Sequence, residues 1–172
     1  MYENKYSAVK ILFIIIIFIY GVFGIIDSQN FLLIKSVDLM FHEFGHLFFM
    51  FGGEMLHFFG GTIMQLLIPN VFLFYFFGKR KFYSCAVMLF WIAVNLFDVA
   101  IYIKDARAMD LPLLISGSTH DWNHILTVMG LIDFDLIIGN IVFGFGIIYF
   151  LLSIILGIYF SKNREEEKGL LD

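Results

Sequence analysis

The stretch Leu39–Phe51, LMFHEFGHLFFMF, places three ionisable side chains in an otherwise apolar run. His42 and His46 are four residues apart, so on a helix both imidazoles lie on one face and can bind the same metal ion. Glu43 lies beside that face. This HExxH spacing is typical of zinc hydrolases in which the glutamate is a general base. The alternatives are a histidine pair held by polar partners on neighbouring helices, or a zinc site without turnover.

The composition of the chain indicates the surroundings of this motif. Of the 172 residues, 60% are hydrophobic and only 15% are charged, and the mean hydropathy is +0.88. Such values exclude an ordinary soluble domain and predict an all-α polytopic membrane protein that forms a single membrane domain over residues 1–172. A buried histidine pair and glutamate are costly in an apolar slab unless something pairs with them, and Zn²⁺ would do so.

The charge pattern and the cysteine count exclude further classes. No basic patch is suited to nucleic acid, so the expected surroundings are the lipid bilayer. The single cysteine, Cys85, cannot form an internal disulfide.

Apolar windows predict about five transmembrane helices, each near the ~20 residues that crossing a bilayer requires. The predicted spans cover residues 8–26, 31–51, 62–77, 82–103 and 136–160, with a loop over 104–132 and a polar tail over 161–172. The HExxH motif lies in the second span. The first span could imitate a signal peptide, but its apolar run ends without a small-residue cleavage site, so we expect a retained helix.

Glycines follow the HExxH span. Gly52-Gly53 and Gly60-Gly61 bracket a short segment, which predicts a Gly-rich turn or small hairpin rather than a helix. His57 lies in this segment without a spaced partner, so we expect it to be structural.

Positive charge predicts the orientation. The basic residues 79–81, Lys-Arg-Lys, lie between the third and fourth spans and are expected in the cytoplasm. With five spans the C-terminal tail falls on the same side. The N-terminus then lies on the opposite side, against the preference of Lys5 and Lys10.

The histidine pair needs a third ligand, because a catalytic zinc site typically has three protein ligands and a water. Asp98 lies about as deep in the fourth span as the pair does in the second, and an aspartate inside an apolar helix indicates a function. Asp98 is therefore the predicted third metal ligand, and Asp105 is the next candidate. Asn95, on the same span, could bind the substrate backbone, because polar groups of a peptide need partners in lipid.

The segment 120–124, HDWNH, is the second dense polar cluster. His120 and His124 are four residues apart and could also bind a metal, with Asp121 orienting a ligating histidine. The other interpretation is that Thr119 or Asp121 caps a short helix near Trp122, whose ring lies at the membrane interface.

Three features accompany the HEFGH motif: the Gly60-Gly61 pair, Pro69 and the tripeptide Asn-Leu-Phe at 95–97. Together they cover about residues 38–107 and resemble the site-2 protease family of intramembrane zinc metalloproteases. In that family the tripeptide is usually followed by proline, and a later Asp-Gly supplies the third zinc ligand. Here Asp98 takes the proline position, and the nearest analogue of Asp-Gly is Asp105-Ala106.

The resemblance implies a zinc metallopeptidase. It would hydrolyse a peptide bond of a membrane protein or peptide within or near the bilayer, with Glu43 as catalytic base and His42 and His46 as metal ligands. Two other functions stay open: hydrolysis of a lipid amide or ester, and a non-catalytic membrane scaffold that binds a metal. The sequence indicates no oligomeric state.

Overall fold

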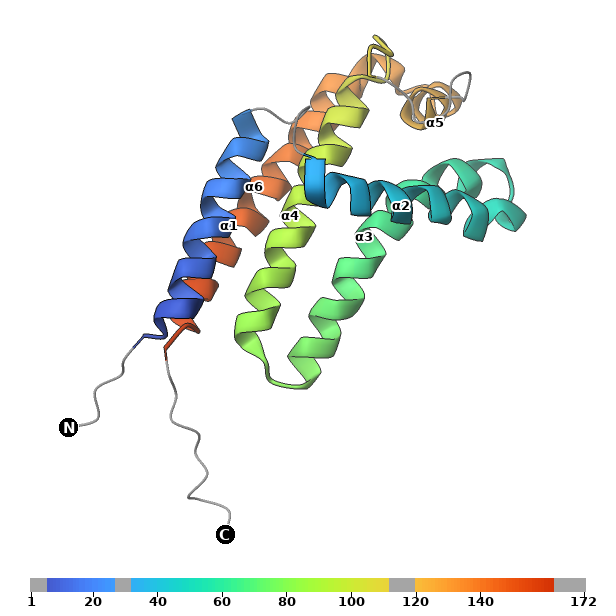
Figure 1. The fold of residues 1–172 in the computed structure, drawn as a ribbon. Helices are drawn as coiled ribbons and strands as arrows, with labels where there is room; N and C mark the ends of the chain where they lie inside the picture. Colours follow the sequence, from blue (N-terminus) through green and yellow to red (C-terminus); the bar gives the residue numbers. More distant parts are fainter. Residues whose placement is uncertain (1–5, 27–31, 112–119, 163–172) are drawn as a thin grey trace, which may run out of the picture.

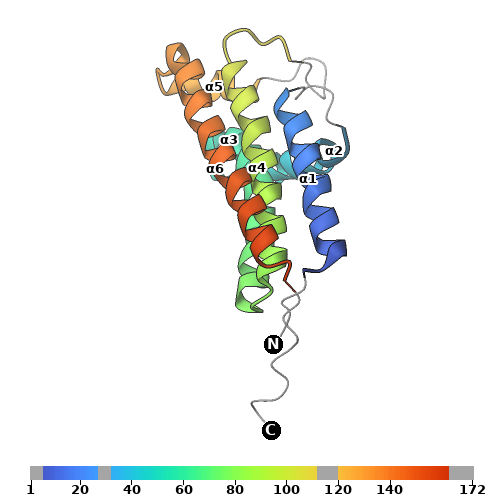
Figure 2. The same cartoon turned by 90° about the vertical axis from the view of Figure 1, so that its left-hand side faces the viewer.

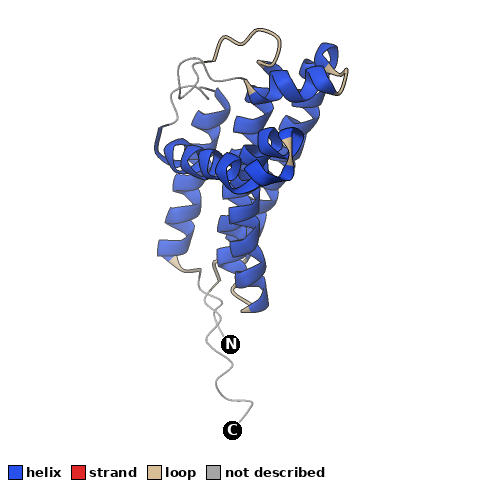
Figure 3. Cartoon of the chain, turned by 90° about the vertical axis from the view of Figure 1, so that its right-hand side faces the viewer, coloured by secondary structure: helices blue, strands red, loops and turns tan. Residues whose placement is uncertain are grey.

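The computed structural model describes residues 6–26, 32–111 and 120–162. Within these ranges the chain is all-helical, as predicted, and contains no strand beyond a single bridge between Tyr6 and Lys162 (Figure 3). The helices are α1 (Ala8–Ile26), α2 (Leu32–Phe49), α3 (Glu54–Gly78), α4 (Phe82–Lys104), α5 (Asp121–Val128) and α6 (Asp135–Tyr159), with 3₁₀ turns η1 (Met50–Gly52) and η2 (Ile132–Phe134) (Figure 1).

Four segments are long and apolar enough to cross a membrane: α1, α3, α4 and Ile132–Tyr159, which contains α6. The helix α2, which occupies most of the second predicted span, is not among them. Its 18 residues include Lys35, Asp38 and Glu43, and these charges make it less apolar than the other long helices. It also runs across the bundle instead of along it (Figure 1). The described residues therefore contain four candidate spans, where the sequence predicted five.

The helix α4 is the centre of the bundle. It runs side by side with α6 (Figures 1 and 2) and packs against α3 on another face. Because lipid is as apolar as a leucine side chain, close packing holds such helices together. Glycines allow that approach: a Cβ on Gly146 of α6 would lie 2.6 Å from the ring of Phe97 in α4.

A cluster of apolar side chains packs α5 against the end of α4. Ile103 and Ala106 are fully buried there against Trp122, Ile125 and Leu126 of α5. The predicted loop 104–132 thus contains a docked helix; its residues 112–119 lie outside the described ranges.

The glycines after α2 have two different roles. Gly53 has a φ of +91° and forms the turn into α3, a conformation that favours glycine. Gly60 and Gly61 lie inside α3, so the prediction that 54–61 is a turn is wrong. They are buried where α3 packs against α2, and a Cβ on Gly60 would lie 2.7 Å from the carbonyl oxygen of Gly45. Glycine is needed at this pair for a close helix contact and not for a turn.

Candidate metal centre

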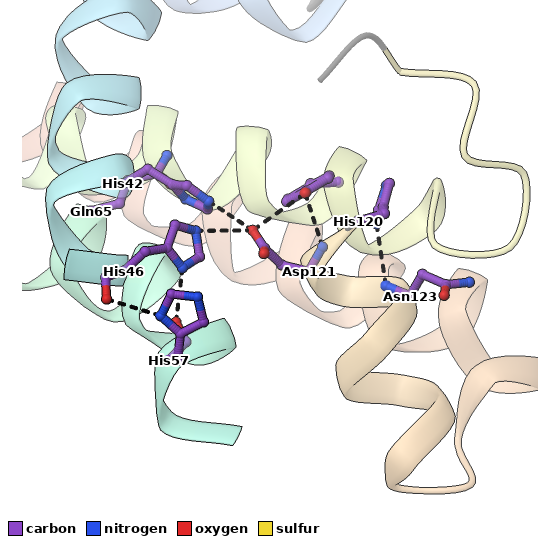
Figure 4. Close-up of polar contacts among 8 residues, drawn as sticks. His42, His46, His57, Gln65, His120, Asp121 and Asn123 are labelled. Carbon is purple, nitrogen blue, oxygen red and sulfur yellow. Dashed lines mark hydrogen bonds and ion pairs between the residues drawn. The ribbon is translucent and has the colours of Figure 1, made fainter. Parts of the chain in front are cut away.

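Helices α2 and α5 bring three ligand atoms together (Figure 4). The Nε2 atom of His42 lies 3.0 Å from Oδ2 of Asp121, and Nε2 of His46 lies 3.2 Å from the same oxygen. All three ligand atoms lie within 4.8 Å of one another. In a tetrahedral zinc site with bonds of about 2.0–2.1 Å, neighbouring ligand atoms are roughly 3.3 Å apart. The donor set and its spacing therefore fit a zinc ion.

The other nitrogen of each imidazole is already occupied. Nδ1 of His42 lies 3.2 Å from Oε1 of Gln65, and Nδ1 of His46 lies 2.8 Å from the carbonyl oxygen of His57. Both partners are acceptors, so each Nδ1 carries a hydrogen. Each Nε2 faces the carboxylate of Asp121, to which it donates a hydrogen bond when the ring is charged, and it offers a lone pair to a metal ion when the ring is neutral. The two rings are thus held in the tautomer and orientation that metal ligation requires.

The helix α3 supplies both of these acceptors and the space for the rings. His57 also donates from its own Nδ1 to the carbonyl oxygen of His46 at 3.0 Å, which makes the α2–α3 contact reciprocal. A Cβ on Gly61 would lie 2.5 Å from Nε2 of His42. The glycine at this position lets the His42 ring lie between the two helices.

Asp121 is positioned by the end of α4 and by the first turn of α5. The hydroxyl of Tyr102 accepts from the backbone N–H of Asp121 at 3.1 Å and donates to its carboxylate at 3.3 Å. His120 caps α5, since its Nδ1 accepts from the N–H of Asn123 at 3.2 Å, and its Nε2 lies 3.1 Å from the carboxylate of Asp105. Asp121 therefore reaches the histidines from a backbone that is fixed at several points.

His46 and Asp121 stabilise each other's charged forms. Burial alone would raise the pKa of Asp121, but hydrogen bonds from His42 and His46 outweigh it and lower that pKa to about 2. Burial alone would lower the pKa of His46, but Asp121, the carbonyl of His57 and the charge of Glu43 raise it above its ordinary value. A metal ion would replace the protons that this cluster holds, so its binding would release them.

Glu43, the predicted base, is half-buried on α2. It lies close enough to His46 for its charge to act on that histidine. The structure thus keeps all three members of the motif in one place, as expected for consecutive turns of one helix.

Asp98, the predicted third ligand, does not join the histidines. Its Oδ1 atom lies 3.9 Å from Nζ of Lys35, near the start of α2. The depth comparison assumed that α2 and α4 run alongside each other, whereas α2 crosses the bundle (Figure 1). The group that could hold a metal ion takes its third ligand atom from Asp121 instead. The carboxylate of Asp105, the other candidate, lies beside His120.

Asn95, the predicted substrate-binding residue, is fully buried in α4. Its amide donates to the carbonyl oxygen of Trp91 at 3.0 Å and faces the carboxyl of Asp38. It is therefore part of the bundle interior and belongs to a different polar group from the histidines.

The sequence did contain a signal for Asp121. It lies in the cluster 120–124, and the two interpretations of that cluster were a metal site and a helix cap. In the structure His120 caps α5, so Asp121 is not the cap, and Thr119, the other predicted cap, lies outside the described residues. Asp121, predicted to orient a ligating histidine, is itself a ligand candidate, whereas His120 and His124 face Asp105 and Glu54. Nothing in the sequence pointed to Gln65 or Tyr102, because neither residue has a partner nearby along the chain.

Comparison of the chain with family models, with curated proteins and with solved structures finds no match. The similarity to the site-2 protease family therefore rests on the short motifs, and the argument for a metal rests on the geometry of the site.

Proposed function

We propose that this protein is a zinc-dependent intramembrane metalloprotease in which His42, His46 and Asp121 bind the ion. One observation carries the proposal: both histidines are held through Nδ1, so that both Nε2 atoms converge on one carboxylate oxygen. A histidine pair with a merely structural role would not need this matched orientation. Without a metal, both nitrogens of each ring would face acceptors, and only a doubly protonated, charged imidazole would satisfy them.

When bound, zinc would supply a Lewis acid that polarises a carbonyl and brings the pKa of a water towards ~7. The chain supplies the remaining chemistry. Glu43 takes a proton from the attacking water and returns it to the leaving amine. Gln65 and the carbonyl of His57 hold the imidazoles still during this exchange, and Tyr102 does the same for Asp121.

The basic residues support a membrane arrangement of four crossings in place of five. The start of α1, the end of α6 and the turn between α3 and α4 lie at one end of the bundle (Figure 1). That end carries Lys10, Lys162 and the basic residues 79–81. With α2 lying across the bundle, these groups share one side, as the positive-inside rule favours. The metal centre and α5 are nearer the opposite end.

Cysteine labelling in intact cells tests this arrangement. Tyr6→Cys, Arg80→Cys and Ala108→Cys are made singly in a Cys85→Ala background and treated with an impermeant reagent. Four crossings with a cytoplasmic basic end predict labelling at position 108 alone. Five crossings with a cytoplasmic 79–81 turn predict labelling at positions 6 and 108.

The function is tested on the full-length protein in detergent, with zinc content and peptide hydrolysis measured together. The wild type should contain stoichiometric zinc, and His42→Ala should contain none. Glu43→Gln should keep its zinc while cleavage of a transmembrane peptide falls by about 10²–10⁴-fold, the usual contribution of a general base.

Three results would contradict the proposal in whole or in part. A metal-free wild type would remove every zinc function. A zinc-loaded wild type that cleaves a lipid amide or ester, and no peptide, would favour the other hydrolase. Unchanged turnover in Glu43→Gln would remove the role given to that glutamate.

A further inference from the structure

The exposed side of α2 is apolar. Five large side chains form this outer face: Val37, Met40, Phe44, Leu47 and Phe48. They recur at intervals of three or four residues, so they lie along one side of the helix. The polar residues Asp38 and His42 are buried on the other side. A surface helix in water has the reverse arrangement, with its apolar side inward and its polar side outward.

The start of α2 is fixed to the middle of α4. The ammonium of Lys35 lies 3.9 Å from the carboxylate of Asp98, and the indole N–H of Trp91 donates to Asp38 at 2.7 Å. Trp91 comes nine residues after the first residue of α4, and Asp98 comes six residues before the last. The start of α2 therefore lies at the level of the middle of this candidate span, away from both of its ends.

The later turns of α2 stay at this level. His42 lies 3.2 Å from Gln65 of α3, and the residue after Gln65, Leu66, lines a cavity together with Leu96 of α4. Leu96 lies between the two residues of α4 that hold the start of α2. Figure 1 shows the same course, since α2 crosses the direction of α4 instead of following it. A helix that stays at one level of a spanning helix lies in the plane of the bilayer.

The outer face lacks the small residues that another helix would need in order to pack on it. Helices in lipid associate where small residues allow their backbones to approach closely. On α2 this residue is Gly45, which faces inward, because a Cβ there would clash with the carbonyl of Gly60 in α3. The outer face presents only large apolar side chains, as does the exposed side of α3 at Leu67 and Val71. Acyl chains fit such a surface, since they need no complementary shape.

We propose that α2 lies in the plane of the bilayer, with its outer face against the acyl chains of lipids. As a helix it satisfies most of its backbone polar groups internally, which is what contact with lipid requires. His42 and His46 lie away from the outer face, so α2 shields the metal centre from the acyl chains. The inference rests on the membrane arrangement proposed above, and it depends neither on zinc nor on peptide cleavage.

Spin labels placed in pairs test this orientation. Val37→Cys and Phe48→Cys, eleven residues apart on α2, are made singly in the full-length protein with Cys85→Ala and reconstituted in phosphatidylcholine vesicles. Ile137→Cys and Ile148→Cys, with the same spacing on the exposed side of α6, form the matched pair. Collision rates with oxygen and with a water-soluble nickel chelate give the depth of each label. We expect the α2 labels to differ in depth by less than one helical turn, about 5 Å, and the α6 labels by about 16 Å.

Both α2 labels should also collide more often with oxygen than with the nickel chelate. A separation of about 16 Å in the α2 pair would show that α2 crosses the bilayer, and the arrangement of four crossings would fail with this inference. Labels reached mainly by the nickel chelate would place the outer face in water. Labels shielded from both reagents would show that protein covers the face, and spectra broadened by neighbouring labels would identify a second copy.

The last two outcomes overturn this inference but leave the four crossings and the proposed zinc site untouched. A second pair guards against a variant that does not fold. Met40→Cys and Leu47→Cys lie on the same outer face, seven residues apart. Their depths should again agree within about 5 Å, whereas a crossing helix would separate them by about 10 Å.

Discussion

Two polar groups of this protein, one at His42 and His46 and the other at Asp38, lie on the same face of α2. They differ in the side chains that the neighbouring helices place against them. Asp38, His42 and His46 follow one another at intervals of four residues along α2, so they form one line. At the histidines, α3 and α5 supply acceptors only, so the protons of charged rings or a metal ion must complete the cluster. At Asp38, α4 supplies the indole N–H of Trp91, beside the ion pair of Lys35 and Asp98.

The difference teaches that the partner helices, and not α2 itself, decide the chemistry of each position. Two imidazoles with their Nδ1 atoms already bonded can offer only Nε2, which favours a metal. A buried carboxyl group that accepts from an indole N–H instead joins α2 to α4. The following predictions test this contrast, from the largest expected effect to the smallest.

The largest effect on zinc binding is expected when the two candidate third ligands, Asp121 and Asp98, are each replaced by alanine. Asp121→Ala should abolish stoichiometric zinc binding, because it removes the oxygen that both Nε2 atoms face. Asp98→Ala should keep its zinc, since that carboxylate lies beside Lys35. Metal analysis of the two purified variants distinguishes the two candidates. Loss of zinc from Asp98→Ala alone would show that Asp98, as predicted from the sequence, is the third ligand.

Gly61→Ala should disturb the metal centre through packing alone. The new Cβ would lie 2.5 Å from Nε2 of His42, so the ring must move, and overpacking of this kind costs about 1–3 kcal/mol. We expect lower stability together with weaker zinc binding. Gly144→Ala in α6 is the matched control, because no heavy atom lies within 4 Å of its Cβ position. Equal behaviour of the two variants would contradict the close contact between α3 and His42.

Gln65→Leu should weaken zinc binding by about 10–100-fold, the usual effect of removing the partner that orients a ligating histidine. The fold should persist, since leucine has a similar volume. Asn70→Leu, five residues further along α3, is the control, because Asn70 bonds to the carbonyl of Leu66 and not to a histidine. A zinc titration that separates neither variant from the wild type would show that His42 is oriented without Gln65.

Trp91→Phe should have the smallest effect and should act on the polar group at Asp38. It removes the N–H that donates to Asp38, and the loss of such a hydrogen bond costs about 1 kcal/mol. Zinc binding should not change. Trp122→Phe provides the comparison, because the Nε1 atom of Trp122 has no hydrogen-bond partner among the residues described. If both variants lose the same unfolding free energy, the indole contributes packing only.

The sequence by itself determined the class of structure and one half of the site. Apolar runs with few charges can only be helices in a membrane-like environment, and four of the predicted spans correspond to helices long enough to cross. The HExxH spacing was sufficient to place His42, Glu43 and His46 together, because the period of a helix is a local property.

Only the tertiary structure decided the direction of α2, the close helix contact at Gly60 and Gly61, and which residue stands as candidate third ligand. His42 and Asp121 are 79 residues apart along the chain. They meet because α2 crosses the bundle and α5 docks on the end of α4, a packing of separate helices that no local pattern encodes. For the same physical reason Asp98 lies beside Lys35, although it matches the histidines in depth along its own helix. Asp121, which the sequence predicted only as a cap or a supporting residue, lies beside the histidines instead.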